Sequence, residues 1–89
     1  MHARILRLMR DKVRRREYVM TLHADDEMDN DGLTILDVES AILTGRIIES
    51  QQDRRTREQK YLVRGQIADG SQLIVVATKF RHTGKLVIL

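Results

Sequence analysis

The dipeptide Asp69-Gly70 lies between two runs rich in β-branched and aromatic residues, and it constrains the fold more than any other feature of the sequence. Asp-Gly in this setting favours a two-residue hairpin turn of type I′, in which both central residues have positive φ. The sequence therefore predicts a strand from Lys60 to Ile67 and a return strand from Gln72 to Phe80. With this turn, Lys60 would lie opposite Lys79.

The same register places Arg64 opposite Val75 and assigns the two faces of the hairpin, because side chains alternate along a strand. One face is strongly apolar, so we expect it to pack on helices; it carries Tyr61, Val63, Ile67, Ile74, Val76 and Phe80. The opposite face combines cations with apolar side chains, namely Lys60, Arg64, Lys79 and Arg81 with Leu62, Leu73, Val75 and Ala77.

The first half of the chain has helical periodicity, and the period changes at Gly45. We expect helices over residues 4–17 and 22–30, separated by a short β-prone segment, and a third helix that Thr34 caps and Gly45 ends. A strand beginning at Ile47-Ile48, a polar connection over 51–58 and a last strand over 85–89 complete the pattern. The predicted fold is α+β, with N-terminal helices packed on a C-terminal antiparallel sheet.

The composition is that of one small globular domain, which we expect to span residues 1–89. The chain has 89 residues, of which 42% are hydrophobic, enough for one core. It contains no cysteine, which excludes disulfides and thiolate zinc sites and fits a reducing cytoplasm, where we expect the protein. No apolar run approaches the length of a membrane span, so we expect no membrane partner.

Charge is segregated along the chain. Residues 1–17 carry seven bases and two acids, whereas residues 23–39 carry seven acids and no base. Such segregation favours a polyanion such as RNA as partner of the basic part. The alternative is a solvated surface whose charges pair within the molecule.

The acidic stretch LHADDEMDNDGLT, residues 22–34, does not match a metal site. It resembles the opening of a calcium-binding EF-hand loop if Glu27 is first, since Gly32 is then sixth, but the twelfth position is Val38 instead of a bidentate glutamate. His23, Asp26 and Glu27 have a helical spacing that is common by chance. We therefore expect no metal and no cofactor. His23 is either a structural residue of this turn or a general acid or base.

Several short motifs together resemble a bacterial family of small domains of unknown function, DUF4258, from about Ile5 to Leu89. They are Tyr18-x-x-Thr21-x-His23-Ala24, Met28, Gly32-Leu33-Thr34, Asp37-Val38-Glu39, Gly45-x-Ile47-Ile48-Glu49, Tyr61-Leu62-Val63-Arg64-Gly65 and Lys85-Leu86-Val87-Ile88. The family is similar in size and order of elements to the RelE, BrnT and MqsR toxins. Two departures are Glu27, where members often have arginine, and Leu89, after which members often continue.

This resemblance implies a toxin-like fold, a neighbouring antitoxin protein as partner, and metal-independent cleavage of RNA. The alternative is a non-catalytic RNA- or protein-binding module. RNA supplies its own nucleophile, so an endoribonuclease needs a proton-transfer group and cationic donors for the phosphate. The candidates are His23 or Tyr61 for proton transfer and Arg64, with Lys79 and Arg81, for phosphate. Further RNA-binding candidates are Lys60, Arg54 and Arg55, although the hairpin register assigns Tyr61 to the core face.

The run Leu86-Val87-Ile88-Leu89 bears on association. A strand that is apolar on both faces is covered on both sides or lies inside its sheet, whereas an open edge of this composition pairs with another chain. The face with Leu62, Leu73 and Val75 adds apolar surface. We therefore expect a homodimer or a complex with an antitoxin, formed over this face or edge.

Overall fold

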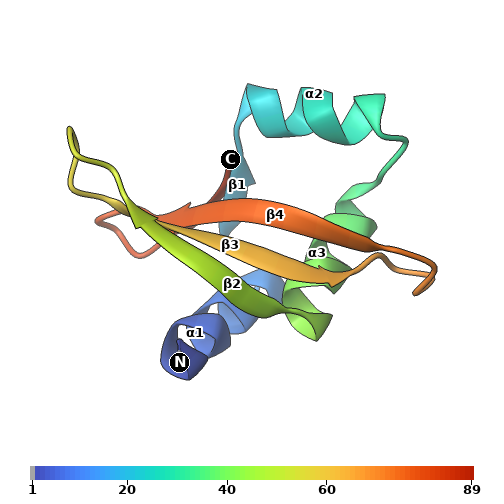
Figure 1. Ribbon diagram of the computed structural model, residues 1–89, viewed down its shortest axis with the longest axis horizontal. Coiled ribbons are helices and arrows are strands. Elements are labelled where there is room, and N and C mark those ends of the chain that lie inside the picture. Colours follow the sequence, from blue (N-terminus) through green and yellow to red (C-terminus); the bar gives the residue numbers. More distant parts are fainter. Residues whose placement is uncertain (1) are drawn as a thin grey trace.

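In the computed structural model of residues 2–89, two helices cover one face of a five-stranded sheet, and a further helix lies beside one edge of that sheet (Figure 1). The elements follow the order α1 (Ala3–Arg14), β1 (Tyr18–Met20), α2 (Leu22–Asn30), α3 (Ile35–Thr44), β2 (Arg46–Gln52), β3 (Gln59–Gln66), β4 (Leu73–Phe80) and β5 (Leu86–Ile88). The α+β fold is therefore confirmed, with α1 and α3 packed on the sheet. None of the helices in this range is both long and apolar enough to cross a membrane.

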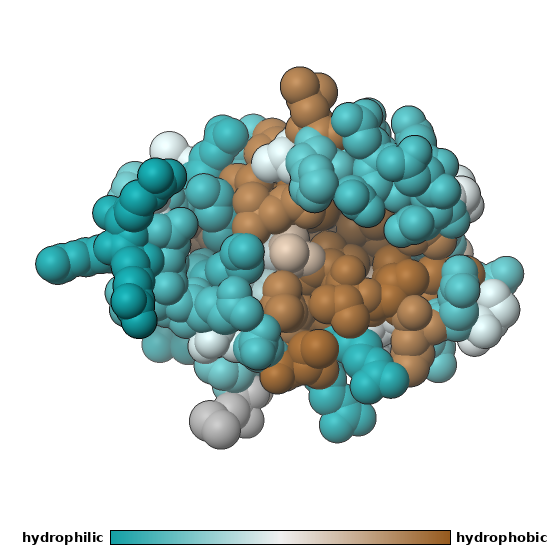
Figure 2. All heavy atoms as spheres, turned by 45° about the horizontal axis from the view of Figure 1, so that its top comes forward, coloured by the Kyte–Doolittle hydropathy of each residue, from teal (hydrophilic) through white to brown (hydrophobic). Residues whose placement is uncertain are grey.

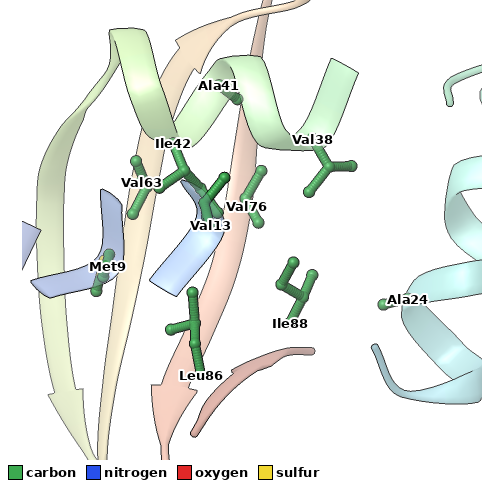
Figure 3. Packing of buried hydrophobic residues seen from close by; sticks show 10 residues of the cluster. All are labelled: Met9, Val13, Ala24, Val38, Ala41, Ile42, Val63, Val76, Leu86 and Ile88. Atoms are coloured by element: carbon green, nitrogen blue, oxygen red, sulfur yellow. The ribbon is translucent and has the colours of Figure 1, made fainter. Parts of the chain in front are cut away.

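The core lies between the sheet and the helices α1 and α3 (Figure 3). Its buried side chains come from both layers, and they include Met9, Val13, Ala41, Ile42, Val63, Val76, Leu86 and Ile88. The start of α3 is fixed as expected, because the Thr34 N–H donates to the Asp37 carboxylate at 2.9 Å. The predicted apolar face of the hairpin is the face that packs here, since Val63, Ile67 and Val76 are buried.

The pairing of β3 with β4 has the predicted register, with Lys60 opposite Lys79 and Arg64 opposite Val75. The predicted type I′ turn is wrong. Such a turn needs positive φ at both central residues, and here Gly70 has positive φ but Asp69 does not. The loop is longer, since the Ile67 N–H donates to the Gln72 carbonyl at 3.0 Å and the Gly70 N–H to the Ile67 carbonyl at 2.9 Å. Lengthening the loop by one residue on each side leaves the register unchanged.

The sheet is mixed, with strand order β1-β5-β4-β3-β2. The short strand β1 pairs in parallel with β5, and the expectation of a purely antiparallel sheet is wrong at this pair. Strand β5 lies between β1 and β4, and its residues Leu86, Val87 and Ile88 are at most 2% exposed. The apolar run near the end of the chain is thus inside the sheet, and it offers no open edge to another chain.

Helix α3 approaches β3 so closely that there is no space for a side chain at Gly65. A Cβ atom built on Gly65 would lie 1.9 Å from the carbonyl oxygen of Ala41. Arg10 then connects α1 to the same region, because its guanidinium donates to the carbonyl oxygens of Ile42 at 3.3 Å and Gly45 at 2.8 Å. These contacts fix β3 against the helices, so that the opposite face of β3 is turned to solvent.

Helix α2 is set apart from the other two helices (Figure 1). Thr21 caps its first turn, since its hydroxyl oxygen accepts a hydrogen bond from the Ala24 N–H at 3.1 Å. Ala24 is the buried residue of this helix, whereas Leu22 is 84% exposed. Helix α2 therefore adds a narrow apolar contact to the same core that α1 and α3 cover, and it presents its carboxylates to solvent.

Candidate nucleic-acid interface

Two arginines lie opposite each other on the solvent-facing side of the sheet. The register of β2 and β3 pairs Arg46 with Arg64, and both side chains are exposed. Like charges directly opposite each other on neighbouring strands are destabilising. Within residues 2–89, no carboxylate forms an ion pair with either guanidinium. This arrangement has an unmatched positive charge that an anionic ligand would neutralise.

The surface is hollowed at this arginine pair. The depression is lined by Thr44, Gly45, Arg46, Ile48, Arg64, Gly65, Gln66 and Leu73. Thr44 connects the end of α3 to β3 here, because its hydroxyl donates to the Ser40 carbonyl at 2.8 Å and accepts from the Gln66 N–H at 3.0 Å. Guanidinium groups present planar donor pairs that match phosphate oxygens. The depression is therefore suited to a phosphate group.

A second pair of like charges lies further along the same face, where Lys60 is opposite Lys79. Here the charge is partly neutralised, because the Glu58 carboxylate is 3.1 Å from the Lys79 ammonium. Lys60 and Arg64 are four residues apart on β3, which corresponds to roughly 13 Å along the strand. The cations thus form a row along β3, with Lys79 contributing less free charge than the arginines.

The remaining predicted RNA-binding residues lie at one end of this row. Arg54 and Arg55 are exposed in the loop between β2 and β3, and Arg81 is exposed just after β4. Asp53 shapes the loop, since one of its carboxylate oxygens accepts from the Arg55 N–H at 2.8 Å and from the Thr56 N–H at 3.3 Å. These hydrogen bonds lower the pKa of Asp53, so that its carboxylate stays charged beside the two arginines.

The three residues proposed for catalysis are not brought together. His23 is on α2, with its side chain 78% exposed and its Nε2 atom 3.8 Å from Glu27. Tyr61 is on the core face of β3, where its ring meets the His2 ring edge-on with 5.9 Å between centroids. Arg64 is on the other face of that strand. No proton-transfer candidate from this set therefore adjoins the arginine pair.

The structure also shows where the side chains that could bind a metal ion lie. Among residues 2–89, no three histidine or carboxylate side chains are gathered where they could hold a metal ion. The carboxylates of α2 are exposed and spread around the helix.

Sequence reasoning missed Arg46. It precedes Ile47-Ile48, so a strand beginning with those residues would exclude it. Strand β2 begins at Arg46, and the register shifts between Ile47 and Glu49, which leaves Ile48 exposed. A bulge of this kind changes which side chains share a face, and no local sequence signal marks it here. The length of the loop from β2 to β3 was also unknown, so the pairing of Arg46 with Arg64 could not be derived.

Several residues of the motifs have structural roles. The Tyr18 hydroxyl donates to the Glu39 carboxylate and thereby links β1 to α3. Burial together with this hydrogen bond raises the pKa of Tyr18, which keeps the phenol protonated. Thr21 caps α2, and Gly65 allows the close approach of α3. These motif residues therefore stabilise the fold, and none of the three takes part in the arginine pair.

Comparison with known proteins supports one assignment. No curated protein and no solved structure matches the chain. The family described as domain of unknown function DUF4258 matches residues 20–89, which include every strand after β1 and the helices α2 and α3. The chain therefore belongs to the DUF4258 family of domains of unknown function.

Proposed function

We propose that this chain is a toxin-like RNA-binding domain that holds the RNA backbone on the solvent-facing side of its sheet. The observation that carries the proposal is the arginine pair Arg46 and Arg64, which lies over a depression and has no carboxylate partner within residues 2–89. A phosphate between the two guanidinium groups would remove the repulsion between them and accept paired hydrogen bonds.

The surroundings of this pair favour an extended, single-stranded polyanion. Positive charges continue along β3 to Lys60 and then to the loop with Arg54 and Arg55. Apolar side chains lie between them on the same face, where Leu73 is 52% and Val75 is 54% exposed. Bases that are not stacked in a duplex can rest on such apolar surface while the phosphates contact the cations. With 3% aromatic residues, recognition would depend on the backbone more than on base stacking.

Binding has stronger support than cleavage. Metal-independent cleavage of RNA needs a group that removes the proton from the 2′-hydroxyl close to the bound phosphate. Neither His23 nor Tyr61 adjoins the arginine pair, so endoribonuclease activity of the RelE type would need the bound RNA to reach one of them from this surface. Cytoplasmic location and control by an antitoxin belong to the same toxin-like proposal.

Binding of a fluorescent, unstructured RNA oligonucleotide, measured by anisotropy at several salt concentrations, tests the proposal. Arg46→Gln and Arg64→Gln should each weaken binding to all sequences, because phosphate contacts carry no sequence information. Each should also reduce the slope of log affinity against log salt by about 0.7, as expected for one lost phosphate contact to a single strand. Lys79→Gln should have a smaller effect, since Glu58 already neutralises part of its charge.

The matched control is Arg7→Gln, which removes an exposed arginine from α1, on the opposite side of the sheet. Its affinity and salt slope should be close to those of the unchanged protein. Equal losses in all three arginine variants would contradict a site on the sheet and indicate diffuse attraction to the basic chain. Incubation of the same RNA with the protein and a chelator tests cleavage. Products that are lost in His23→Gln would show that α2 contributes to a reaction after all.

A further inference from the structure

Strand β4 is paired over only part of its length on the side of β5. The two strands pair from Thr78 to Phe80, and the Leu89 N–H donates to the Ala77 carbonyl at 2.9 Å. In an antiparallel ladder, every second residue turns its N–H and C=O to the same side. The backbone groups of Val75 and Leu73 therefore face the same side as those of Ala77. Within residues 2–89, no strand pairs with β4 at Leu73 and Val75 on the side where β5 pairs further along.

A groove lies directly beside this unpaired stretch. It has a volume of about 250 Å³ and separates α2 from the edge of β4. Apolar side chains from both sides line it, including Met20, Ala24, Met28, Ile74, Val76 and Ile88. Figure 2 shows the corresponding hydrophobic area next to the hydrophilic surface of α2. The edge thus offers backbone donors and acceptors next to apolar surface, which is what an added strand requires.

Charge around the groove selects what could occupy it. Glu27 and Asp31 of the α2 region line the groove, and α2 carries no lysine or arginine, although His23 is 3.8 Å from Glu27. A second copy of this chain would bring its own acidic α2 to the same place, and the two helices would repel each other. An incoming segment with lysine or arginine at its ends would be attracted instead.

We propose that the edge formed by Leu73 and Val75, with the groove beside it, binds an extended segment of a partner protein. The segment adds a strand of about four residues to β4. It carries apolar side chains at alternate positions, which enter the groove, and basic residues at its ends, which meet Glu27 and Asp31. The site uses the outward backbone groups of Leu73 and Val75 and the groove beside α2, whereas the proposed RNA surface uses the side chains of these two residues and the arginine pair. The two proposals therefore share two residues but rest on different groups.

The probe is a capped synthetic peptide of about eight residues, in which valine and threonine alternate between two terminal lysines. Hydrogen exchange of individual amides, followed by NMR on the intact chain, is the measurement. Addition of the peptide should slow the exchange of the Leu73 and Val75 amides, because added backbone hydrogen bonds remove them from water. An unchanged exchange rate at both amides under saturating peptide would overturn the proposal.

Two altered peptides separate the components of the site. A peptide with terminal glutamates should bind about ten-fold more weakly, because two attractive contacts become repulsive. A peptide with N-methyl groups on its valines should not protect either amide, since it cannot form the ladder. Equal binding of the N-methylated peptide would mean that the groove takes apolar groups without adding a strand, which contradicts the proposal.

Two variants test the site from the protein side. Val75→Pro removes one edge N–H, and proline is tolerated on an edge strand, so this variant should lose peptide binding. If Val75→Pro fails to fold, the double variant Glu27→Gln with Asp31→Asn leaves the strand intact. This double variant should bind the lysine peptide no more tightly than it binds the glutamate peptide. Arg7→Gln, at an exposed position of α1, is the control and should bind normally. Protection of Leu73 and Val75 that grows with protein concentration alone would identify a second copy as the occupant and overturn the proposal.

Discussion

The guanidinium of Arg10 lies at the C-terminal end of α3, where it donates to the carbonyl oxygens of Ile42 and Gly45. Hydrogen bonds from a charged donor to such carbonyls contribute about 1.5–3 kcal/mol. We expect Arg10→Met, which keeps the length of the side chain, to lower the free energy of unfolding by this amount in urea titrations. Arg7→Met, at an exposed position of the same helix, should change it by no more than about 0.5 kcal/mol. Similar losses in both variants would show that helix charge, and not the contact with α3, is responsible.

At the level of single residues, the sequence predicted which face of the hairpin each side chain occupies, because alternation along a strand is a local rule. It predicted the exposed Arg64 and the core position of Tyr61 in this way. It could not predict that Arg10 serves the fold, because the carbonyl groups it binds are more than thirty residues away. Nor could it place Arg46, whose face depends on a bulge. Which basic residues of such a chain stabilise the fold, and which are free to bind a ligand, can therefore be decided only when the fold is known.

The close contact between α3 and β3 can be tested by a single substitution at Gly65. Gly65→Ala would place a Cβ atom 1.9 Å from the Ala41 carbonyl oxygen, so helix and strand must separate. Overpacking of this kind costs typically about 1–3 kcal/mol, and a backbone neighbour cannot rotate away. Thermal unfolding should show a clear decrease in Tm. An equally stable Gly65→Ala variant would mean that helix and strand leave room for a side chain at this position.

Among the elements, those defined by local signals were predicted well. The cap at Thr34, the end of α3 at Gly45 and the register of β3 with β4 follow from residues close in sequence. The turn at Asp69-Gly70 was wrong in type, because the Asp69 carboxylate accepts from the Ser71 N–H at 2.8 Å and stabilises a longer loop. The parallel pairing of β1 with β5 joins segments far apart in the chain, and no local pattern indicates it.

The stability of the whole molecule should depend on pH through Asp37. Its carboxylate accepts from the Thr34 N–H at 2.9 Å and from the Ala68 N–H at 3.0 Å, and these bonds hold its pKa below the usual value. A lowered pKa in the folded state stabilises the fold above the ordinary pKa of aspartate, near 3.9. That contribution is lost as the pH falls through the lower, folded value. Stability measured from pH 5 to 2 should therefore decrease in this range.

Asp37→Asn isolates this dependence. The variant should be less stable at pH 7, because its amide group cannot accept both hydrogen bonds, and its stability should fall less steeply between pH 4 and 2. Asp53 and Asp69 have lowered pKa values for similar reasons, so part of the acid dependence should remain. The control is Asp29→Asn, an exposed position on α2. Identical pH profiles for the unchanged protein and Asp37→Asn would show that Asp37 does not link protonation to folding.

The central position of β5 determines when the sheet can be completed during synthesis. Strands β2, β3 and β4 form consecutive pairs and can assemble as the nascent chain leaves the ribosome. Strand β1 is made early, but its partner β5 is made last of all the strands. Until residues 86–88 have emerged, the segment Tyr18–Met20 and one edge of β4 stay unpaired in the cell, and both can be captured by other newly made chains. Because β1 and β5 are so far apart in the sequence, the time needed to synthesise the residues between them determines how long these edges are exposed to aggregation.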